Sequence, residues 1–185
     1  MGRLIVVQFS TLDGVVEDPD GSSHTAFGGW AMRYGPQGVA GDKFRLGPIL
    51  QHGTLLFGRR TWEHFSNLWP HRDDPFSQAI NAADKAVVTH RAIDERTWSN
   101  SRAIDQPLAA WVRHHVTTTD LVVIGSHSVV DELAEADLVD EYRLLTFPTA
   151  AGAGRRLFTD GRMLELISAE QVGPAVLTVL TTRGA

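Results

Sequence analysis

The apolar residues of this chain gather in short runs separated by polar, glycine-containing or proline-containing segments. The run Leu121–Ile124 is continuous and rich in β-branched residues, which is typical of a strand buried on both faces. After it, Val129, Val130 and Leu133 recur at the spacing of one helix face. Because another apolar run, Tyr142–Phe147, follows, we predict a strand–helix–strand unit, the crossover that parallel strands require.

Similar runs predict the remaining strands, at Leu4–Ser10, Leu55–Phe57, Ala86–Thr89, Trp98–Ile104, Leu164–Val172 and Ala175–Thr182. Helices are predicted at Asp42–Leu50, from Arg59 onward, near Ser77–Ala83, and after Asp105, which would cap the helix that follows. Gly173 and Pro174 join the last two strands as a hairpin. This order predicts an α/β fold with a central, mostly parallel sheet, flanking helices and a C-terminal antiparallel hairpin.

Residues 17–41 show no apolar periodicity and are rich in glycine, proline and polar residues. A long loop in a compact domain is often a lid or a binding loop. The alternative is a loop that packs onto the domain surface. Trp30 lies in this segment and could either cover a ligand or simply pack.

Composition narrows the class of protein. At 185 residues, with 43% hydrophobic and 21% charged residues, we expect one globular domain, residues 1–185. The absence of cysteine excludes disulfides and thiol catalysis and fits a cytoplasmic protein. We expect no signal peptide and no membrane contact, since no apolar run is long enough. The net charge of -5 argues against nucleic acid as a partner.

Three of the predicted strands are followed directly by turns suited to anions: residues 58–61, 89–91 and 125–126. Backbone N–H groups at helix starts and guanidinium groups both suit phosphate binding. If the strands are parallel, these turns lie along one carboxyl edge, where open α/β sheets bind ligands. The sequence therefore favours a nucleotide or another phosphorylated ligand, and the alternative is a set of solvated surface arginines.

Other site patterns are incomplete. Gly152-Ala-Gly154 lacks the third glycine of the dinucleotide fingerprint, and no P-loop motif is present. The eight histidines are scattered without a His-Glu-x-x-His pattern, so no metal site is predicted. Ser126, His127 and Asp131 suggest a serine hydrolase, but the Gly-x-Ser-x-Gly turn is missing, and helix capping by the serines is favoured.

Asp42 is the carboxylate of most interest for catalysis. An acid in a cleft can have a raised pKa and take part in proton transfer. The alternative is an aspartate that is stabilised by the dipole of the helix it opens.

Together, these segments resemble the dihydrofolate reductase-like superfamily, and within it the reductase (C-terminal) domain of the bifunctional riboflavin-biosynthesis deaminase-reductase. The resemblance covers nearly the whole chain and rests on the segments Ser10–Gly14, Leu56–Glu63, Val122–Ser126, Leu138–Glu141, Pro148 and Gly152–Phe158. It implies the dihydrofolate reductase-like α/β fold. The chain departs from the family pattern at Ser126, where the second glycine of a pair is usual. A serine tolerates less close approach of a ligand to the backbone than glycine.

The resemblance implies NADPH as the hydride donor. The cofactor-binding residues that it implies are Val16, Glu17, Gly58, Arg59, Arg60, Thr61, Thr89, His90, Arg91, Gly125 and Ser126. Residues 58–61 would bind the phosphates, with an arginine near the 2′-phosphate. Residues 89–91 would contact the adenosine end, 125–126 the pyrophosphate and nicotinamide, and 16–17 the region near the nicotinamide. Asp42 precedes Gly58 by 16 positions, the spacing of the pterin-binding acid of dihydrofolate reductases, and is the candidate catalytic residue.

The leading hypothesis is an NADPH-dependent reductase that transfers a hydride to a small heterocyclic (pteridine- or pyrimidine-like) or carbonyl substrate. The alternative is a catalytically silent nucleotide-binding or dimeric interaction protein on the same fold. Relatives of the riboflavin type are commonly dimers, so the resemblance also implies a homodimer, through sheet or C-terminal segments.

Overall fold

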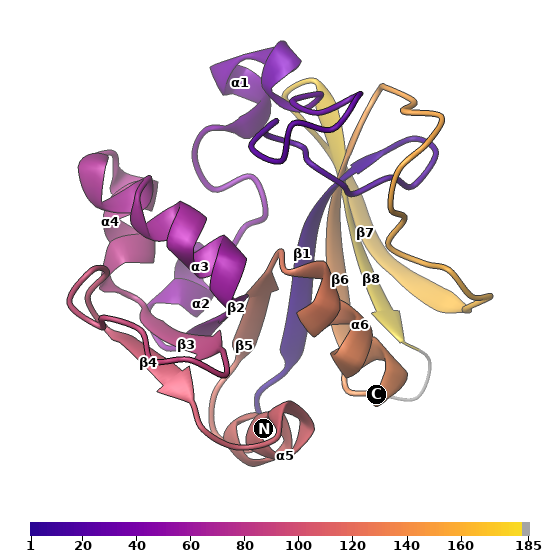
Figure 1. Ribbon diagram of the computed structural model, residues 1–185. Coiled ribbons are helices and arrows are strands. Elements are labelled where there is room, and N and C mark those ends of the chain that lie inside the picture. Colours follow the sequence, from indigo (N-terminus) through magenta and orange to yellow (C-terminus); the bar gives the residue numbers. More distant parts are fainter. Residues whose placement is uncertain (183–185) are drawn as a thin grey trace. The chain divides into compact units, whose positions relative to one another are not determined.

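The structure is a computed structural model that describes residues 1–182 of the chain. Its eight strands follow the order β4-β3-β2-β5-β1-β6-β8-β7 (Figure 1). The contacts of the chain divide it into two compact units. The first unit holds Met1–Val6 and Arg45–Glu141, and the second holds Val7–Phe44 and the chain from Tyr142 onward. Strand β1 (Leu4–Thr11) contributes its beginning to the first unit and the rest to the second.

The strands of the first unit are parallel neighbours: β4 (Ser101–Ile104), β3 (Asp84–Val88), β2 (Thr54–Gly58) and β5 (Leu121–Ile124). Thr54 lies opposite Asp84 on one side and opposite Leu121 on the other. Lys85 in turn lies opposite Ser101. The predicted bounds of β5 are confirmed, because its four residues leave the sheet at Gly125, whose φ of 68° no longer suits a strand.

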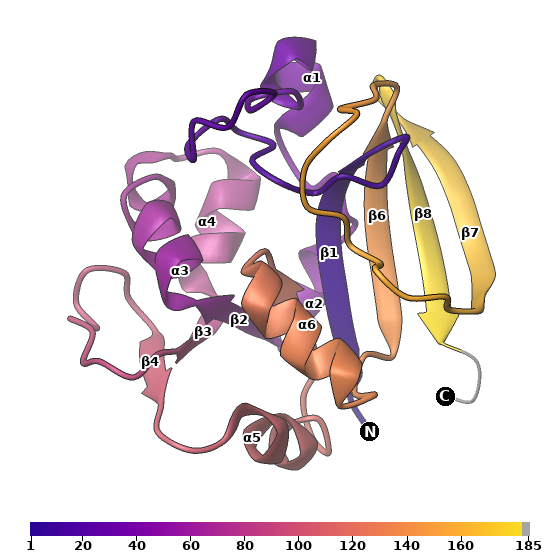
Figure 2. The same ribbon diagram turned by 45° about the vertical axis from the view of Figure 1, so that its right-hand side comes forward.

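The helices of the first unit are α2 (Gly47–Leu50), α3 (Arg59–Ser66), α4 (Pro75–Ala82), α5 (Leu108–His115) and α6 (His127–Glu135), with a 3₁₀ turn η2 at Trp69–His71. Helix α3 lies against β2 and β3. Helix α6 lies against β2 and beside α5 (Figure 2). These contacts place the starts of α3 and α6 next to the strands that precede them.

Two helix starts differ from the sequence-based expectation. The helix predicted at Asp42–Leu50 is only the short α2, because Arg45 has a left-handed φ of 57° that interrupts any helix before it. The helix predicted to be capped by Asp105 begins later, with Pro107 at its N-cap. The carbonyl of Pro107 accepts the N–H groups of Ala110 and Trp111, so the proline fixes the start of the helix.

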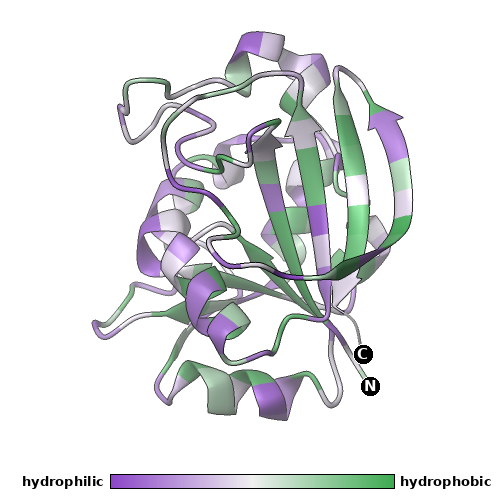
Figure 3. Cartoon of the chain, turned by 90° about the vertical axis from the view of Figure 1, so that its right-hand side faces the viewer, coloured by the Kyte–Doolittle hydropathy of each residue, from purple (hydrophilic) through white to green (hydrophobic). Residues whose placement is uncertain are grey.

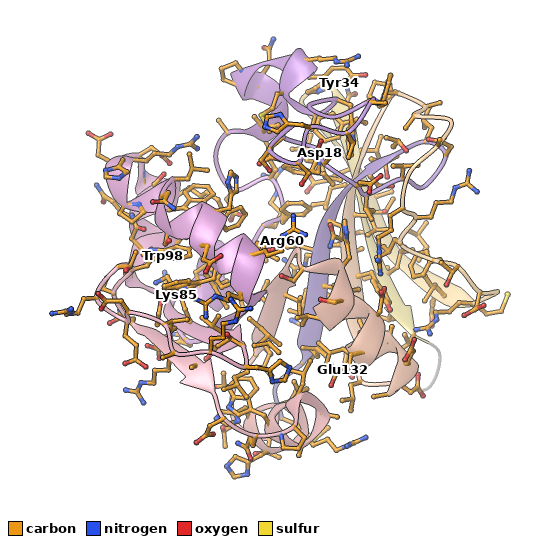
Figure 4. The ribbon with its side chains drawn as sticks, in the orientation of Figure 1. Asp18, Tyr34, Arg60, Lys85, Trp98 and Glu132 are labelled. Carbon is orange, nitrogen blue, oxygen red and sulfur yellow. The ribbon has the colours of Figure 1, made fainter. Side chains whose placement is uncertain are left out.

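Lys85 is buried inside the first unit, with only 2% of its surface exposed. Its Nζ donates hydrogen bonds to the carbonyls of Asn81 at 2.9 Å, Ala83 at 2.7 Å and Ser99 at 3.0 Å. It lies 4.6 Å from the centre of the Trp98 ring (both are labelled in Figure 4). Burial lowers the pKa of Lys85 to about 8. The ammonium group therefore joins the end of α4 to the chain that enters β4.

The second unit contains the rest of β1, all but the first residue of β6 (Glu141–Phe147), β8 (Ala175–Thr182) and β7 (Leu164–Val172), with η1 at Met32–Tyr34 and α1 at Pro36–Val39. Strands β7 and β8 are antiparallel, as predicted, with Leu164 opposite Thr182 and an irregularity between Leu166 and Ser168. The core of this unit gathers aromatic and aliphatic side chains, among them Trp30, Leu145, Phe147, Val172 and Leu177.

The loop between β1 and η1 is a packed loop, the second of the two readings of residues 17–41. Asp18 is 5% exposed and accepts hydrogen bonds from the N–H groups of Ser23 and Thr25 and from the Thr25 hydroxyl. Burial alone would raise the pKa of Asp18, but these hydrogen bonds outweigh it and lower the pKa. Trp30 donates through Nε1 to the carbonyl of Glu17 at 2.9 Å. The loop is thus fixed from within by a carboxylate and an indole.

Asp13 holds the turn after β1 against the segment that follows β6. Its carboxylate accepts hydrogen bonds from the Thr11 hydroxyl and from the backbone N–H groups of Ala151 at 3.0 Å and Gly152 at 2.7 Å. The hydrogen bonds from Thr11, Ala151 and Gly152 lower the pKa of Asp13 to about 2. The charged form of Asp13 is therefore the one that holds these two segments together.

Replacing Lys85 by methionine should lower the free energy of unfolding by about 2–4 kcal/mol, since three buried carbonyls would lose their donor. Denaturant unfolding measures the change. The matched control is Lys43→Met, which removes the chain's only other lysine at a half-exposed position and should change the free energy little. A loss at Lys85 no larger than that at Lys43 would contradict the structural role.

Replacing Asp13 by asparagine should lower the thermal midpoint at neutral pH, and the difference from the wild type should close in acid. The folded pKa of about 2 lies below the ordinary 3.8, so the carboxylate stabilises the fold fully above about pH 4 and loses that effect as the pH falls towards 2. Thermal scans from pH 6 to pH 2 measure the difference. Asp160→Asn, at an exposed position, is the control and should show no such closing gap.

Candidate functional site

Three turns meet at one edge of the sheet in the first unit. Gly58 lies opposite Val88, and Leu56 lies opposite Val123, so β2, β3 and β5 end at the same edge. The residues that follow these strand ends are the anion-suited turns 58–61, 89–91 and 125–126. The convergence expected from the sequence is confirmed by the parallel register, and this edge is the candidate site.

Arg59 connects two of these turns. Its Nε lies 2.7 Å from Glu63 Oε1, one helical turn further along α3. Its terminal nitrogen donates to Thr89 Oγ1 at 3.3 Å and to the carbonyls of Arg91 at 3.3 Å and Ala92 at 3.1 Å. Because Nε and one terminal nitrogen of Arg59 already have protein acceptors, this arginine positions the segment after β3, and its second terminal nitrogen is what it can offer to a phosphate.

Arg60, His90 and Arg91 are the exposed cationic or titratable side chains of the site. Arg60 extends from the first turn of α3 and is labelled in Figure 4. Among residues 1–182, the Arg60 guanidinium has no hydrogen-bond or ion-pair partner, in contrast to that of Arg59. Arg60 is therefore the arginine of this turn that is available to a ligand.

The turn after β5 has a left-handed backbone at two successive residues, Gly125 with φ 68° and Ser126 with φ 58°. A Cβ atom added at Gly125 would lie 3.4 Å from Thr61 Cγ2, at the short end of the range of ordinary van der Waals contacts. Ser126 is the N-cap residue of α6, but its side chain makes no capping hydrogen bond. The expectation that this serine caps the helix is wrong.

The Ser126 hydroxyl instead reaches across to the turn after β2. Its Oγ accepts the N–H of Gly58 at 2.8 Å and lies 2.8 Å from Thr61 Oγ1. These two partners occupy the hydroxyl oxygen that a hydrolase would need as a nucleophile, so the geometry argues against the serine hydrolase alternative. Sequence reasoning missed this contact because it joins residues 68 and 65 positions apart.

The candidate residues of the second unit are fixed mainly through the backbone. Val16 is buried, and its N–H donates to the carbonyl of Arg155 at 2.9 Å. Glu17 accepts Trp30 Nε1 at its carbonyl and Arg155 N–H at Oε2 at 3.4 Å. Trp30 is 1% exposed and packs edge-on against Phe147, so it is a core residue of this unit. Residues 16–17 are thus fixed by hydrogen bonds to Arg155 and Trp30.

Asp42 lies in an irregular, half-exposed stretch just before α2. Asp42 does not open a helix, so the alternative explanation, stabilisation by the dipole of such a helix, is wrong. Its proton-transfer role stays a prediction. The structure brings together the candidate residues of the first unit, and it holds Val16, Glu17 and Asp42 in the second.

No group of three or more His, Cys, Asp or Glu side chains in residues 1–182 is arranged to bind a metal ion. No helix in the same range is long and apolar enough to cross a bilayer.

Comparison with known families gives one match, which spans both units. Residues 3–178 match the family described as the RibD C-terminal domain. No curated protein sequence matches the chain significantly.

Solved structures with the same fold carry names from riboflavin biosynthesis and pyrimidine reduction. A protein from Shewanella sp. PV-4, named for riboflavin biosynthesis, has a TM-score of 0.70 at 16% identity, with 98% of this chain and 99% of that chain covered. RibD of Acinetobacter baumannii has a TM-score of 0.63 at 15% identity, with 98% and 58% covered. A pyrimidine reductase-like protein from Corynebacterium diphtheriae has a TM-score of 0.63 at 10% identity, with 100% and 93% covered.

The Thermotoga maritima deaminase/5-amino-6-(5-phosphoribosylamino)uracil reductase is similar at a TM-score of 0.61 and 15% identity. The chain covers 56% of that protein and is itself covered to 98%. These likenesses confirm the fold predicted from the sequence, a mostly parallel α/β sheet with a C-terminal antiparallel hairpin.

Proposed function

Because the chain belongs to the RibD C-terminal domain family, we propose that it is an oxidoreductase that uses NADPH to reduce a small heterocyclic or carbonyl substrate. Family membership and the reductases among its structural neighbours support the oxidoreductase class. The cofactor, the substrate class and the roles of single residues are proposed in addition to this class. A cytoplasmic location remains a prediction from the cysteine-free sequence.

The observation that carries the proposal is the convergence of three turns on the carboxyl edge of β2, β3 and β5. This edge offers groups that suit a dinucleotide: the free guanidinium of Arg60, the hydroxyls of Thr61 and Ser126, and the glycine turn at Gly125. The donor set consists of cations and hydroxyls, which fits phosphate oxygens.

In this proposal, NADPH supplies the hydride, and the protein supplies position and electrostatics. Arg60 would bind the 2′-phosphate through paired hydrogen bonds, which selects NADPH over NADH. Arg59 would act indirectly, by holding Thr89 and the backbone of Arg91 at the adenosine end. Asp42 is the proposed residue for substrate binding or proton relay.

The substrate proposed is a pteridine- or pyrimidine-like ring, such as the ribosylaminouracil named for the Thermotoga maritima relative. The alternative is a nucleotide-binding or interaction protein of the same fold without catalysis. One observation favours this alternative: the Ser126 hydroxyl already accepts the N–H of Gly58, a donor at the edge of the site.

The proposal predicts that NADPH raises the thermal midpoint of the protein more than NADH does. A ligand at about 100 times its Kd adds about 2.7 kcal/mol, or roughly 5–10 °C for a chain of this size. Arg60→Ala should weaken NADPH binding about tenfold or more and leave NADH binding nearly unchanged, because only NADPH carries the 2′-phosphate. Thermal shift titrations with both cofactors measure this.

Arg113→Ala is the matched control, since it removes an exposed arginine from α5 in the same unit. Arg59→Ala should weaken both cofactors alike, because it loosens the segment after β3. If no dinucleotide stabilises the folded protein, the reductase proposal fails. Binding of NADPH without oxidation across a panel of pteridines, pyrimidines and carbonyl compounds would support the silent alternative.

We also propose that the protein is a homodimer that associates through the β7–β8 hairpin. Strand β7 ends the strand order, and all its residues from Glu165 to Gln171 are exposed. Leu166 and Ile167 are 60% and 58% exposed, and Figure 3 shows hydrophobic positions along both strands of the hairpin. If two copies of this chain pair around a twofold axis, the β7 edge of each copy covers the β7 edge of the other. This supports a copy of the same chain as the partner.

Light scattering at micromolar concentration should give the mass of a dimer for the wild type. Leu166→Lys should give a monomer, because it replaces an exposed apolar side chain of the edge strand by a charged one. Leu12→Lys is the matched control, since Leu12 is 69% exposed but lies outside the hairpin, and this variant should remain dimeric. A monomeric wild type would refute the proposal.

A further inference from the structure

The chain contains three Asp-Gly pairs, and the structure surrounds each of them differently. The pairs begin at Asp13, Asp20 and Asp160. An aspartate that precedes glycine can react with its own backbone, because glycine has no side chain to keep the carboxyl group away from the next nitrogen. In a folded protein, this reaction depends on how firmly the carboxyl group and the glycine nitrogen are held.

The reaction needs no co-reactant except water. The glycine nitrogen forms a bond to Cγ of the protonated carboxyl group and loses its proton, and the carboxyl OH leaves with that proton as water. The product is a cyclic succinimide, which water then opens at either of its two carbonyls. Opening at one carbonyl restores aspartate. Opening at the other gives isoaspartate, whose main chain runs through Cβ and Cγ and is longer by one CH2 group.

The first pair is held in the turn after β1. The Asp13 carboxylate accepts hydrogen bonds from Thr11, Ala151 and Gly152. The N–H of Gly14 donates to the carbonyl of Thr11 at 3.0 Å. The pKa of Asp13, lowered to about 2 by its hydrogen bonds, also leaves little of the protonated acid from which the ring forms. Both reacting groups must therefore leave their partners before they can meet.

The second pair is held within the packed loop. Oδ1 of Asp20 accepts the N–H of Ser22 at 3.1 Å and the Ser22 hydroxyl at 2.8 Å. The N–H of Gly21 donates to the carbonyl of Asp18 at 3.2 Å. The half-buried carboxylate and the glycine nitrogen of this pair therefore both have partners.

The third pair is exposed in the connection from β6 to β7, which is drawn in orange in Figure 1. Within the described part of the chain, 1–182, neither the Asp160 carboxylate nor the Gly161 N–H has a hydrogen-bond or ion-pair partner. A Cβ atom added at Gly161 would meet no atom within 4 Å. The carboxyl group and the nitrogen can therefore approach each other without breaking a contact.

This pair also lies between two contacts with Tyr142. The Phe158 ring packs edge-on against the Tyr142 ring, with 5.2 Å between their centres. Arg162 donates to the Tyr142 hydroxyl at 3.3 Å. The link between these two contacts consists of residues 159–161. An isoaspartate in this link lengthens the backbone between two fixed points.

We propose that Asp160 is the site at which this protein forms isoaspartate, through a succinimide with the nitrogen of Gly161, while the folded structure protects Asp13 and Asp20. The modification needs no enzyme and accumulates as the protein ages. It keeps one carboxylate at this position and lengthens the link by one CH2 group. The inference is independent of the proposed function, because it involves no ligand.

Peptide mapping after prolonged incubation of the folded protein at mildly acidic pH tests the proposal. Trypsin releases residues 157–162 as a peptide with one aspartate, and cleavage after Glu17 separates Asp13 from Asp20. Electron-transfer fragmentation in the mass spectrometer distinguishes isoaspartate from aspartate. Peptide 157–162 should gain isoaspartate about tenfold or more faster than the other two sites, because those react only when their turns open. Equal rates at the three sites would overturn the proposal.

Two variants link the product to this pair. Gly161→Ala places a Cβ atom beside the attacking nitrogen, and the space around Gly161 is open, so the thermal midpoint should stay that of the wild type. This variant should form isoaspartate at Asp160 several-fold more slowly. Asp160→Glu keeps the charge and should give no such product at this position, because glutamate would have to close a larger ring. Undiminished formation in Gly161→Ala would contradict the mechanism.

The same incubation in denaturant shows whether the fold causes the difference. In the unfolded chain, all three pairs should form isoaspartate at similar rates, because the hydrogen bonds that hold Asp13 and Asp20 are absent. If Asp160 reacts in denaturant but stays unmodified in the folded protein, the fold protects this site as well and the proposal fails.

Discussion

The parallel pairing of β2 with both β3 and β5 is the constraint on which the candidate site depends. Parallel strands in register end at the same edge of the sheet. The pairing of the strands therefore brings the three following turns together, and contacts between the turns are not needed for this. The hydrogen bond from the Gly58 N–H to Ser126 Oγ lies just beyond the end of β5. Backbone pairing and the arrangement of the site are therefore two parts of one network, and a change in strand register would displace all the candidate residues of the first unit at once.

Much of this fold could be read from the sequence, because its strands are apolar runs bounded by strong turn residues. The bounds of Leu121–Ile124 and of both hairpin strands agree with the structure. The helix predicted at Asp42–Leu50 does not agree with the structure, because nothing in the composition of this segment indicates the left-handed backbone of Arg45. That conformation is decided by the surrounding tertiary structure, which outweighs local propensity.

The site was predictable to the level of which turns meet, but not of which side chains are free to act. Arg59 and Arg60 are neighbours of the same type, yet one is held by Glu63 and by carbonyls beyond β3, and the other is not. The bond between Ser126 and Thr61 joins distant positions, so no local pattern signals it. Such long-range side-chain pairing follows only from the register of the strands.

The carbonyl cage around Lys85 has a practical consequence for chemical labelling. The chain has two lysines, and the ammonium group of Lys85 is enclosed by three carbonyls and the Trp98 ring. Acylating reagents need an accessible, uncharged amine, so burial shields Lys85 even though its pKa is lowered. Lys43 is then the one lysine side chain open to such reagents, and a fluorophore or surface linker attached through lysine would report from the second unit.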